Sequence, residues 1–464
     1  MKKINYIPVI IAATVALSCT KTQFDDAEAT SGGSANFSNY IAVGNSLTQG
    51  YQDGGLHNEY QQQENSYPAI IAKQMETSFL QPMVEGAGSG YRKLTSLAPD
   101  IIPVSPEASW GAAGWSTWDK TKQYNNMGVA GILLRDCVSG GTGNTLYAAA
   151  NPYGGYQDLQ TKTYLDNVTA SNATFFTNWL GNNDVLSWAT SGGFDDANGI
   201  PGFSALTPAG EFRTKYDAIL SAFQTMGAKG VCATLADVTA IPFFTTVPHN
   251  PIPLDQANAA ALNSAFAAYN TVLDNLVLAG AISSSEATQR KINFVAGATN
   301  AILIEDESLT DLTPYLPANS PYIKTRQATA ADLILLTSSD TIGKVIGGDP
   351  TKKYGVTIPF SDTFVLTEDE VTEVQTRTLE LNAEIRASAA ANGNVAVVDM
   401  YAVMFELQKG MNFDGVSYTA NYIKGGAFSL DGVHPNSRGY AIIANKFMET
   451  INSRTLPTPF LLTR

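Results

Sequence analysis

The chain has 464 residues, 44% hydrophobic and 15% charged, with 28 basic against 42 acidic side chains and a formal net charge of −14. This composition provides material for a large core, and the length allows about two to four domains of ordinary size. No basic cluster occurs, which argues against nucleic acid as a partner. The three cysteines, Cys19, Cys137 and Cys232, form neither a disulfide framework nor a metal-binding spacing.

The N-terminus reads as a targeting segment. A pair of lysines precedes an apolar run, Ile7 to Leu17, which has the length of a signal peptide and is too short to span a bilayer. Ser18 and Cys19 follow, and the junction resembles a bacterial lipoprotein signal, although its leucine lies one place nearer the cysteine than usual. We therefore predict a signal peptide over residues 1–18, a lipidated Cys19 that attaches an exported protein to a membrane of the cell envelope, and a flexible tether over 19–36. The alternative is an ordinary secretory signal with an incidental cysteine.

The first predicted strand, Tyr40 to Val43, ends in a glycine-flanked turn that contains a serine. Gly44 closes the strand, and Asn45 and Ser46 follow it. In open α/β folds, the C-terminal edge of the sheet is where ligands bind. Backbone N–H groups at such a turn favour developing negative charge. Ser46 is thus a candidate nucleophile if a base can reach it, although the segment read alone could equally be a strand with a polar turn.

The same order of strand, polar turn and helix recurs along the chain. A short strand precedes Asn126–Met127–Gly128, and a β-rich run from Ala173 to Leu180 ends at Gly181–Asn182–Asn183–Asp184. Later segments continue the alternation, with strands predicted at Gly230–Leu235 and Val395–Asp399 and helices at Gln256–Leu278, Thr367–Ala391 and Ser437–Ile451. Strands that alternate with helices indicate an α/β fold with a mostly parallel sheet.

Two stretches do not fit this alternation. Residues near 85–122 are rich in glycine, proline, serine and tryptophan, and residues near 281–366 contain β-like runs with little helical periodicity. We predict that both are insertions that decorate a single domain spanning residues 37–464. The second is long enough to form a small subdomain.

A candidate base lies just before the last predicted helix, in the sequence Asp431–Gly432–Val433–His434. An acid three residues before a histidine in one turn can place its carboxylate beside the ring, fix the tautomer and stabilise the imidazolium. Read alone, the pattern also fits a structural loop. His57 and His249, the other two histidines, have no suitably spaced acid or lie in a proline-rich loop. We interpret both as surface-loop histidines, although either could line the substrate cleft.

Four short blocks occur together in a fixed order: Gly44–Asn45–Ser46–Leu47, Asn126–Met127–Gly128, Gly181–Asn182–Asn183–Asp184 and Asp431–Gly432–Val433–His434. This combination resembles the SGNH hydrolases, also called the GDSL esterase/lipase family, over most of the chain from about Tyr40 to Ile451. The resemblance implies a three-layer α/β/α sandwich with a flavodoxin-like sheet. Asn45 replaces the aspartate that usually precedes the serine, and the long distances between blocks imply sizeable insertions.

The resemblance also implies roles for individual residues. Ser46 corresponds to the nucleophile, His434 to the general base and later acid, and Asp431 to its orienting partner. The oxyanion would be bound by the backbone N–H groups of Ser46 and Gly128 and by the side-chain amide of Asn183.

The implied activity is hydrolysis of small-molecule or lipid carboxylic esters through an acyl-enzyme on Ser46, without a metal or organic cofactor. One alternative is a carbohydrate O-acetyl esterase with the same triad. Another is a non-enzymatic surface lipoprotein that binds ligands on a hydrolase scaffold, although the presence of all three triad residues argues against it. The acyl length, the alcohol part and the oligomeric state are left open by the sequence.

Overall fold

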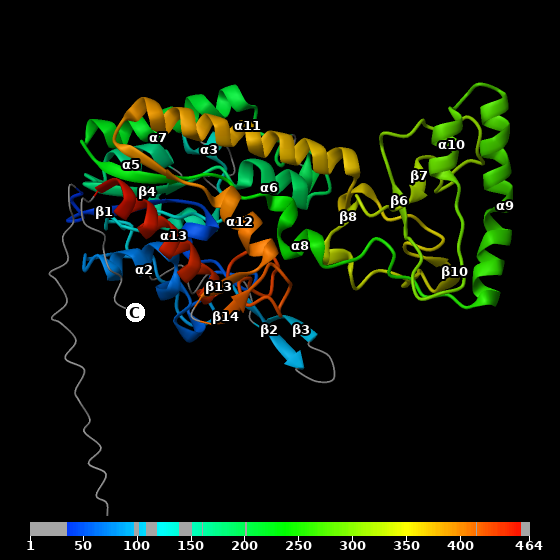
Figure 1. Ribbon diagram of the computed structural model, residues 1–464, viewed down its shortest axis with the longest axis horizontal. Helices are drawn as coiled ribbons and strands as arrows, with labels where there is room; N and C mark the ends of the chain where they lie inside the picture. The colour runs from blue at the N-terminus through cyan, green and yellow to red at the C-terminus, as the bar shows by residue number, and fades with distance from the viewer. Residues whose placement is uncertain are drawn as a thin grey trace, which may run out of the picture.

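The centre of the computed structural model is a four-stranded parallel sheet in the order β1-β4-β5-β12 (Figure 1). The strands are β1 (Tyr40–Gly44), β4 (Phe175–Trp179), β5 (Lys229–Ala233) and β12 (Val395–Val398), and each adjacent pair is parallel. The structure describes residues 35–96, 102–107, 118–138, 151–159, 161–199, 202–413 and 415–455. The predicted signal peptide, Cys19 and most of the predicted tether lie outside these residues.

The free edge of β1 is extended by a short bridge to the second motif block. Ala42 N–H donates to Asn125 O, and Met127 N–H donates to Ala42 O, both at 2.8 Å. The strand predicted here is therefore reduced to a single parallel bridge at Asn126. When this segment is counted as the second strand along the chain, the order of strands across the sheet is 2-1-3-4-5, as in flavodoxin. The direction in which successive strands are added reverses between β1 and β4, which is the switch point of the sheet. The prediction of an α/β fold with a parallel sheet is confirmed.

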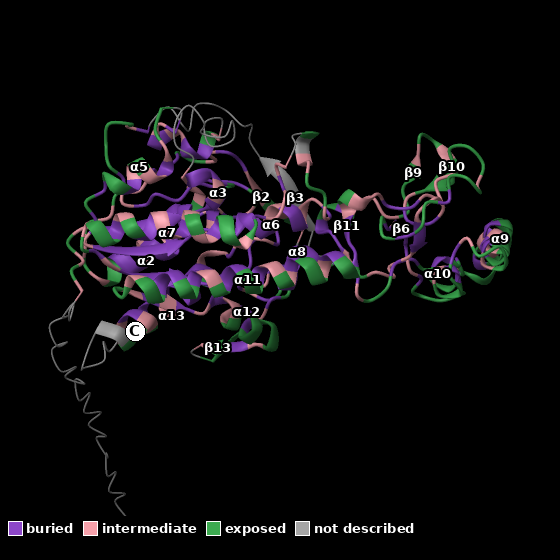
Figure 2. Ribbon diagram, turned by 90° about the horizontal axis from the view of Figure 1, so that it is seen from above, coloured by how far each residue is buried: buried purple, intermediate pink, exposed green. Residues whose placement is uncertain are grey.

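Each face of the sheet is covered by helices, and β1 supplies side chains to both layers. Ile41 and Val43 point into the larger apolar core, whereas Tyr40 and Ala42 point into the smaller one. The larger core includes α3 (Leu134–Cys137), α5 (Tyr164–Thr169), α6 (Asn183–Thr190), α7 (Ala209–Thr225) and α11 (Glu368–Asn392), and the smaller includes α2 (Tyr67–Gln74) and α13 (Ser437–Thr455). Figure 2 shows α7 and α11 with exposed residues on their outer sides. Burial on both faces explains why the strands read as continuous apolar runs.

Several shorter elements surround the C-terminal edge of the sheet. They are α1 (Ser46–Gln49), α8 (Pro242–Thr245), α12 (Met400–Lys409) and the antiparallel pairs β2 (Tyr91–Ser96) with β3 (Ile102–Glu107) and β13 (Met411–Phe413) with β14 (Val416–Tyr418). The pair β2–β3 lies in the insertion predicted near 85–122, whose residues 97–101 and 108–117 lie outside the described part of the chain. Within the described ranges, none of the helices combines the length and apolarity that a membrane span requires.

A separate lobe extends to one side of the sheet domain (Figure 1). It contains α9 (Gln256–Leu278), α10 (Ser284–Arg290), β6 (Leu303–Glu305), β7 (Thr325–Gln327), β9 (Val345–Ile346) and β10 (Asp349–Lys353). The lobe has its own apolar core, in which Phe266 and Leu273 of α9 join Phe294 and Leu312. The predicted insertion at 281–366 thus packs against a helix that precedes it in the chain.

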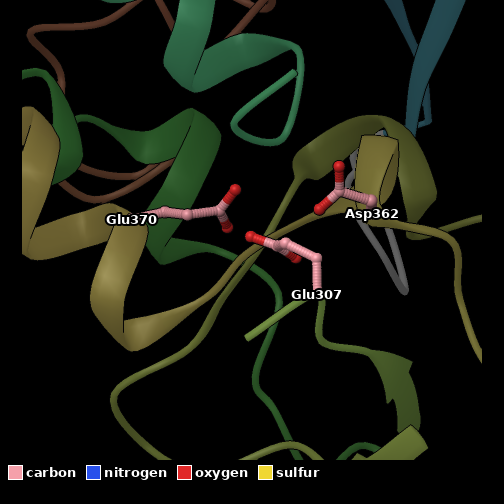
Figure 3. A group of neighbouring side chains, drawn as sticks. All are labelled: Glu307, Asp362 and Glu370. Atoms are coloured by element: carbon pink, nitrogen blue, oxygen red, sulfur yellow. The ribbon is translucent and has the colours of Figure 1, made fainter. Parts of the chain in front are cut away.

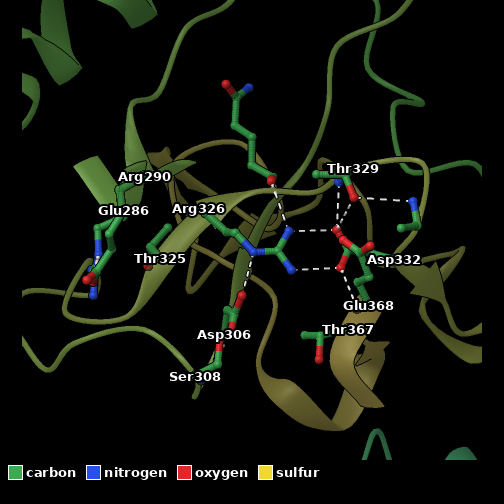
Figure 4. A network of polar contacts seen from close by, with 12 residues as sticks. Glu286, Arg290, Asp306, Ser308, Thr325, Arg326, Thr329, Asp332, Thr367 and Glu368 are labelled. Atoms are coloured by element: carbon green, nitrogen blue, oxygen red, sulfur yellow. Dashed lines mark hydrogen bonds and ion pairs between the residues drawn. The ribbon is translucent and has the colours of Figure 1, made fainter. Parts of the chain in front are cut away.

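The lobe is joined to the sheet domain by a short antiparallel pair and a buried arginine. The pair is β8 (Leu333–Ile334) with β11 (Val365–Leu366). Arg326 donates to Asp306 Oδ2 at 2.5 Å and, through two nitrogens, to both oxygens of Asp332 at 2.6 and 2.7 Å (Figure 4). Asp332 Oδ1 also accepts from the N–H of Glu368 at the start of α11. A buried charge held by two carboxylates ties β7 of the lobe to the first turn of α11.

A second junction between these parts is a group of three carboxyl groups (Figure 3). Glu307 lies after β6, Asp362 lies just before β11, and Glu370 lies in the first turn of α11, with carboxyl oxygens within 4.8 Å of one another. Burial, and then repulsion from Glu307, raise the pKa of Asp362 to about 7. Burial raises the pKa of Glu370 to about 8, although hydrogen bonds from Thr367 oppose the shift.

These raised pKa values predict a fold that is more stable in mild acid. The folded state binds protons at Asp362 and Glu370 more tightly than an unfolded chain does, so their contribution is complete below about pH 4 and is lost as the pH rises through about 7 and 8. The midpoint of thermal unfolding should therefore fall between pH 5 and pH 8.5. Glu370→Gln, which keeps an acceptor for the Thr367 N–H, should flatten this part of the profile. An equal slope in the variant and the unmodified protein would contradict the assignment.

Candidate active site

Ser46 is placed by the turn between β1 and α1. A Cβ atom on Gly44 would lie 2.0 Å from Thr48 Oγ1, so glycine is required where the helix turns back over the strand end. Asn45 is the N-cap of α1, and its side-chain oxygen accepts from Leu47 N–H at 3.1 Å. An aspartate at this position could accept the same hydrogen bond, so Asn45 can replace it as the N-cap of α1.

The structure brings Ser46, His434 and Asp431 together at the switch point of the sheet. Ser46 Oγ lies 2.8 Å from His434 Nε2, and His434 Nδ1 lies 2.7 Å from Asp431 Oδ2. The ring of Tyr51 lies against the imidazole, with centroids 4.6 Å apart. A proton on Nδ1 satisfies the carboxylate and leaves Nε2 as an acceptor for the serine hydroxyl, the arrangement that makes a serine nucleophilic.

Asp431 is held as an ionised carboxylate. Its Oδ1 accepts from the N–H groups of Val433 and His434, both at 2.8 Å, and its Oδ2 accepts from Gly54 N–H at 3.0 Å. Burial raises the pKa of Asp431, but the charge of His434 and the hydrogen bonds from the His434 ring and from the N–H groups of His434 and Val433 outweigh it and lower the pKa to about 2. The side chain is therefore suited to orient and stabilise an imidazolium without taking up its proton.

Asn183 lies at the first position of α6, where the third motif block follows β4. Its side chain is buried and donates from Nδ2 to Ile132 O at 2.9 Å. An amide has two N–H donors, so one donor is anchored and the other is left for a ligand. Asp184 accepts from Leu134 N–H and Thr207 Oγ1, both at 2.7 Å, and so holds the segment that anchors Asn183.

Gly128 differs from the expectation. Its N–H donates to Asn126 Oδ1 at 3.0 Å, and a Cβ atom on it would lie 2.3 Å from the backbone nitrogen of Gln49. This glycine allows close packing against α1, and its N–H is already bonded, so the structure contradicts its predicted role as an oxyanion donor. The chain stays bonded to the end of β1 as far as Val129, whose N–H donates to Gly44 O. Gly131, three residues after Gly128, has a φ of 78°. Gly131 is the second glycine of this turn, and the motif spacing alone pointed only to the first, Gly128.

The other two histidines lie outside the triad. His57 is 1% exposed and stacks on Tyr91 with centroids 4.6 Å apart, so its interpretation as a surface-loop residue is wrong. Its Nε2 lies 3.8 Å from Asp53 Oδ2, so an acid four residues earlier lies near the ring without forming a hydrogen bond to it. His249 is partly exposed, and its backbone oxygen accepts from Ile302 N–H.

Asp53 connects the loop after α1 to the loop that carries the triad acid. Its Oδ1 accepts from Leu430 N–H at 2.8 Å, and its own N–H donates to Ser429 Oγ at 2.9 Å. Ser429 in turn donates to Asp431 Oδ1 at 3.1 Å. Asp53 also has φ 54°, a left-handed conformation that aspartate and asparagine tolerate better than most residues. Asp53 is therefore placed as a positioning residue for Asp431.

This connection predicts a kinetic effect without direct contact with the reacting atoms. Asp53→Ala should lower kcat for an ester by about tenfold to a hundredfold with little change in KM, because misplacing a triad by about 1 Å costs rate more than binding. Asp53→Asn, which keeps an acceptor for Leu430 N–H, should recover most of the activity. Equal loss in both variants, or loss that appears only as a lower unfolding temperature, would count against a positioning role.

Comparison with known proteins adds one finding. Residues 306–447 match the model of the GDSL-like lipase/acylhydrolase family, a range that includes Asp431 and His434 but begins after Ser46. No curated protein and no solved structure matches the chain.

The fold and the site together define a flavodoxin-like protein with a serine, histidine and aspartate at its switch point. The match over residues 306–447 supports the SGNH hydrolases, the GDSL esterase and lipase family, and a hydrolase of ester substrates in general.

Proposed function

We propose that the protein hydrolyses carboxylic esters through an acyl-enzyme on Ser46. The supporting observation is the 2.8 Å contact between Ser46 Oγ and His434 Nε2, with Asp431 behind the ring. Ser46 Oγ attacks the ester carbonyl while His434 takes its proton, and the imidazolium then protonates the departing alcohol. Water attacks the acyl group next, with His434 again taking the proton, and the acid leaves as Ser46 is restored.

The charge on the carbonyl oxygen requires donors at the same edge of the sheet. We assign this role to the N–H of Ser46, the second amide N–H of Asn183 and the N–H of Gly131. Ser46 N–H donates to no acceptor among the described residues, and Asn183 is anchored by Ile132 O. Gly131 lies two residues after Val129, whose N–H is bonded to Gly44 O at the end of β1. Donors fixed in this way need no reorganisation when the tetrahedral intermediate forms.

Labelling with an activated fluorophosphonate tests the proposal directly. The probe should modify Ser46 alone, because a serine becomes nucleophilic only beside a base. Ser46→Ala and His434→Ala should abolish labelling, whereas Ser221→Ala, at an exposed serine of α7, should leave it intact. Labelling that persists in Ser46→Ala would show that the nucleophile is elsewhere.

We further propose that a lipid on Cys19 attaches the mature protein to a bacterial envelope membrane. The support is the order of the lysine pair, the apolar run Ile7 to Leu17 and Cys19, followed by a polar tether. Cys19→Ala should move the protein from the membrane pellet to the soluble fraction. Identical fractionation of the unmodified protein and the variant would contradict lipidation.

A further inference from the structure

A cavity of about 110 Å³ opens beside Ser46 on the side of α12 and α13. Its polar side chains come from the three loops that form the site: Asn45 and Ser46 after β1, Asn182 and Asn183 after β4, and His434 before α13. The rest of the lining is aliphatic, aromatic or thioether, and the indole N–H of Trp179 is already donated to Thr234 O. The cavity therefore has one polar end, at the serine, and apolar walls beyond it.

The apolar wall is built by one face of α12. Met400, Met404 and Leu407 follow one another at spacings of four and three residues, which places them on the same side of the helix. All three are buried, and all three line the cavity. Phe405, the neighbour of Met404, points away from this face and is 54% exposed. Ile442 and Ile443 of α13 complete the wall.

We propose that this cavity binds the acyl chain of the ester, that the chain is a hydrocarbon longer than acetyl, and that Met404 helps to set its maximum length. The inference rests on the proposed function. An acetyl group would leave the apolar wall unfilled, and a sugar ring placed there would bury hydroxyl groups without partners. The acyl group remains on Ser46 while the alcohol leaves and water enters, so an apolar recess suits the acyl part better than the alcohol.

The test compares nitrophenyl esters of increasing acyl length, from acetyl to dodecanoyl, and a second series of acetate esters with increasing alcohol length. In the unmodified protein kcat/KM should rise about fourfold for each added methylene until the cavity is full. Lengthening the alcohol should have a much smaller effect. A flat acyl series, or a steeper alcohol series, would overturn the proposal.

Two variants of Met404 and one matched control test whether this residue limits the length of the acyl chain. Met404→Trp should shift the optimum to shorter chains and lower the ratio of long-chain to short-chain kcat/KM by about tenfold or more, because a filled recess excludes the terminal methylenes. Met404→Ala should shift the optimum to longer chains. Phe405→Trp, one residue away on the exposed side of α12, should leave the length profile unchanged. An identical profile for both Met404 variants and the unmodified protein would refute the role of this residue.

Fluorophosphonate labelling separates the two levels of the argument. If Ser46 is labelled and esters are hydrolysed but the acyl series is flat, the acyl-chain inference fails and the proposed function stands. If Ser46 is not labelled and no ester is hydrolysed, both fail.

Discussion

Replacing Ser46 by alanine should lower kcat for a soluble ester by about a millionfold, and His434→Ala should cost nearly as much. The serine supplies the electron pair and the histidine removes the proton, so each is ineffective without the other at the 2.8 Å contact that joins them. For this reason, the kcat of the double variant with both Ser46→Ala and His434→Ala should be about the same as that of either single variant. Asp431→Ala should be milder, because this residue orients the ring and takes no proton. The measurement is kcat and KM for the three single variants and the double variant on one ester.

His249→Ala is the matched control, since this histidine is partly exposed and contributes a backbone bond that the substitution keeps. Its activity should equal that of the unmodified protein. If losses at Ser46 and His434 multiply in the double variant, the two residues act independently and the triad assignment is incorrect.

The alternation of elements predicted the sheet because side chains on both faces of its strands pack against helices. A run such as Tyr40 to Val43 is apolar throughout, and only a strand between two helical layers needs that pattern. The lobe was harder to delimit. The helix Gln256–Leu278 has the bounds that its sequence predicts, but helical spacing does not show which neighbour the apolar side faces. Its packing on Phe294 and Leu312 depends on contacts between distant segments.

The side chains that meet at the site could be predicted, whereas the state of individual backbone groups could not. Ser46, Asp431 and His434 stand in short motifs at the ends of the chain, and the fold brings them into contact. Whether Gly128 N–H is free depends on the rotamer of Asn126, which motif spacing does not encode. The burial of His57 likewise depends on Tyr91, a residue of β2 that lies 34 positions away.

Asn183→Ala should lower kcat by about a hundredfold to a thousandfold with little change in KM. Its Nδ2 donates one N–H to Ile132 O at 2.9 Å, which fixes the direction of the second. A ground-state carbonyl oxygen carries less charge than the tetrahedral oxyanion and lies slightly elsewhere, so the bond to the amide strengthens as the intermediate forms. The loss should therefore appear in kcat, and the measurement is both kinetic constants on one soluble ester.

Asn182→Ala provides the comparison, because this neighbour also lines the cavity but donates from Nδ2 to Trp179 O at 3.2 Å. That bond ties the turn to the end of β4, so its loss should affect the unfolding temperature more than kcat. Asn183→Ala also leaves Ile132 O without its donor, and the unfolding temperature of both variants separates this structural cost from catalysis. A hundredfold loss of kcat in Asn182→Ala, with Asn183→Ala unaffected, would move the donor by one residue. Equal and small losses in both would leave the oxyanion to the backbone N–H groups alone.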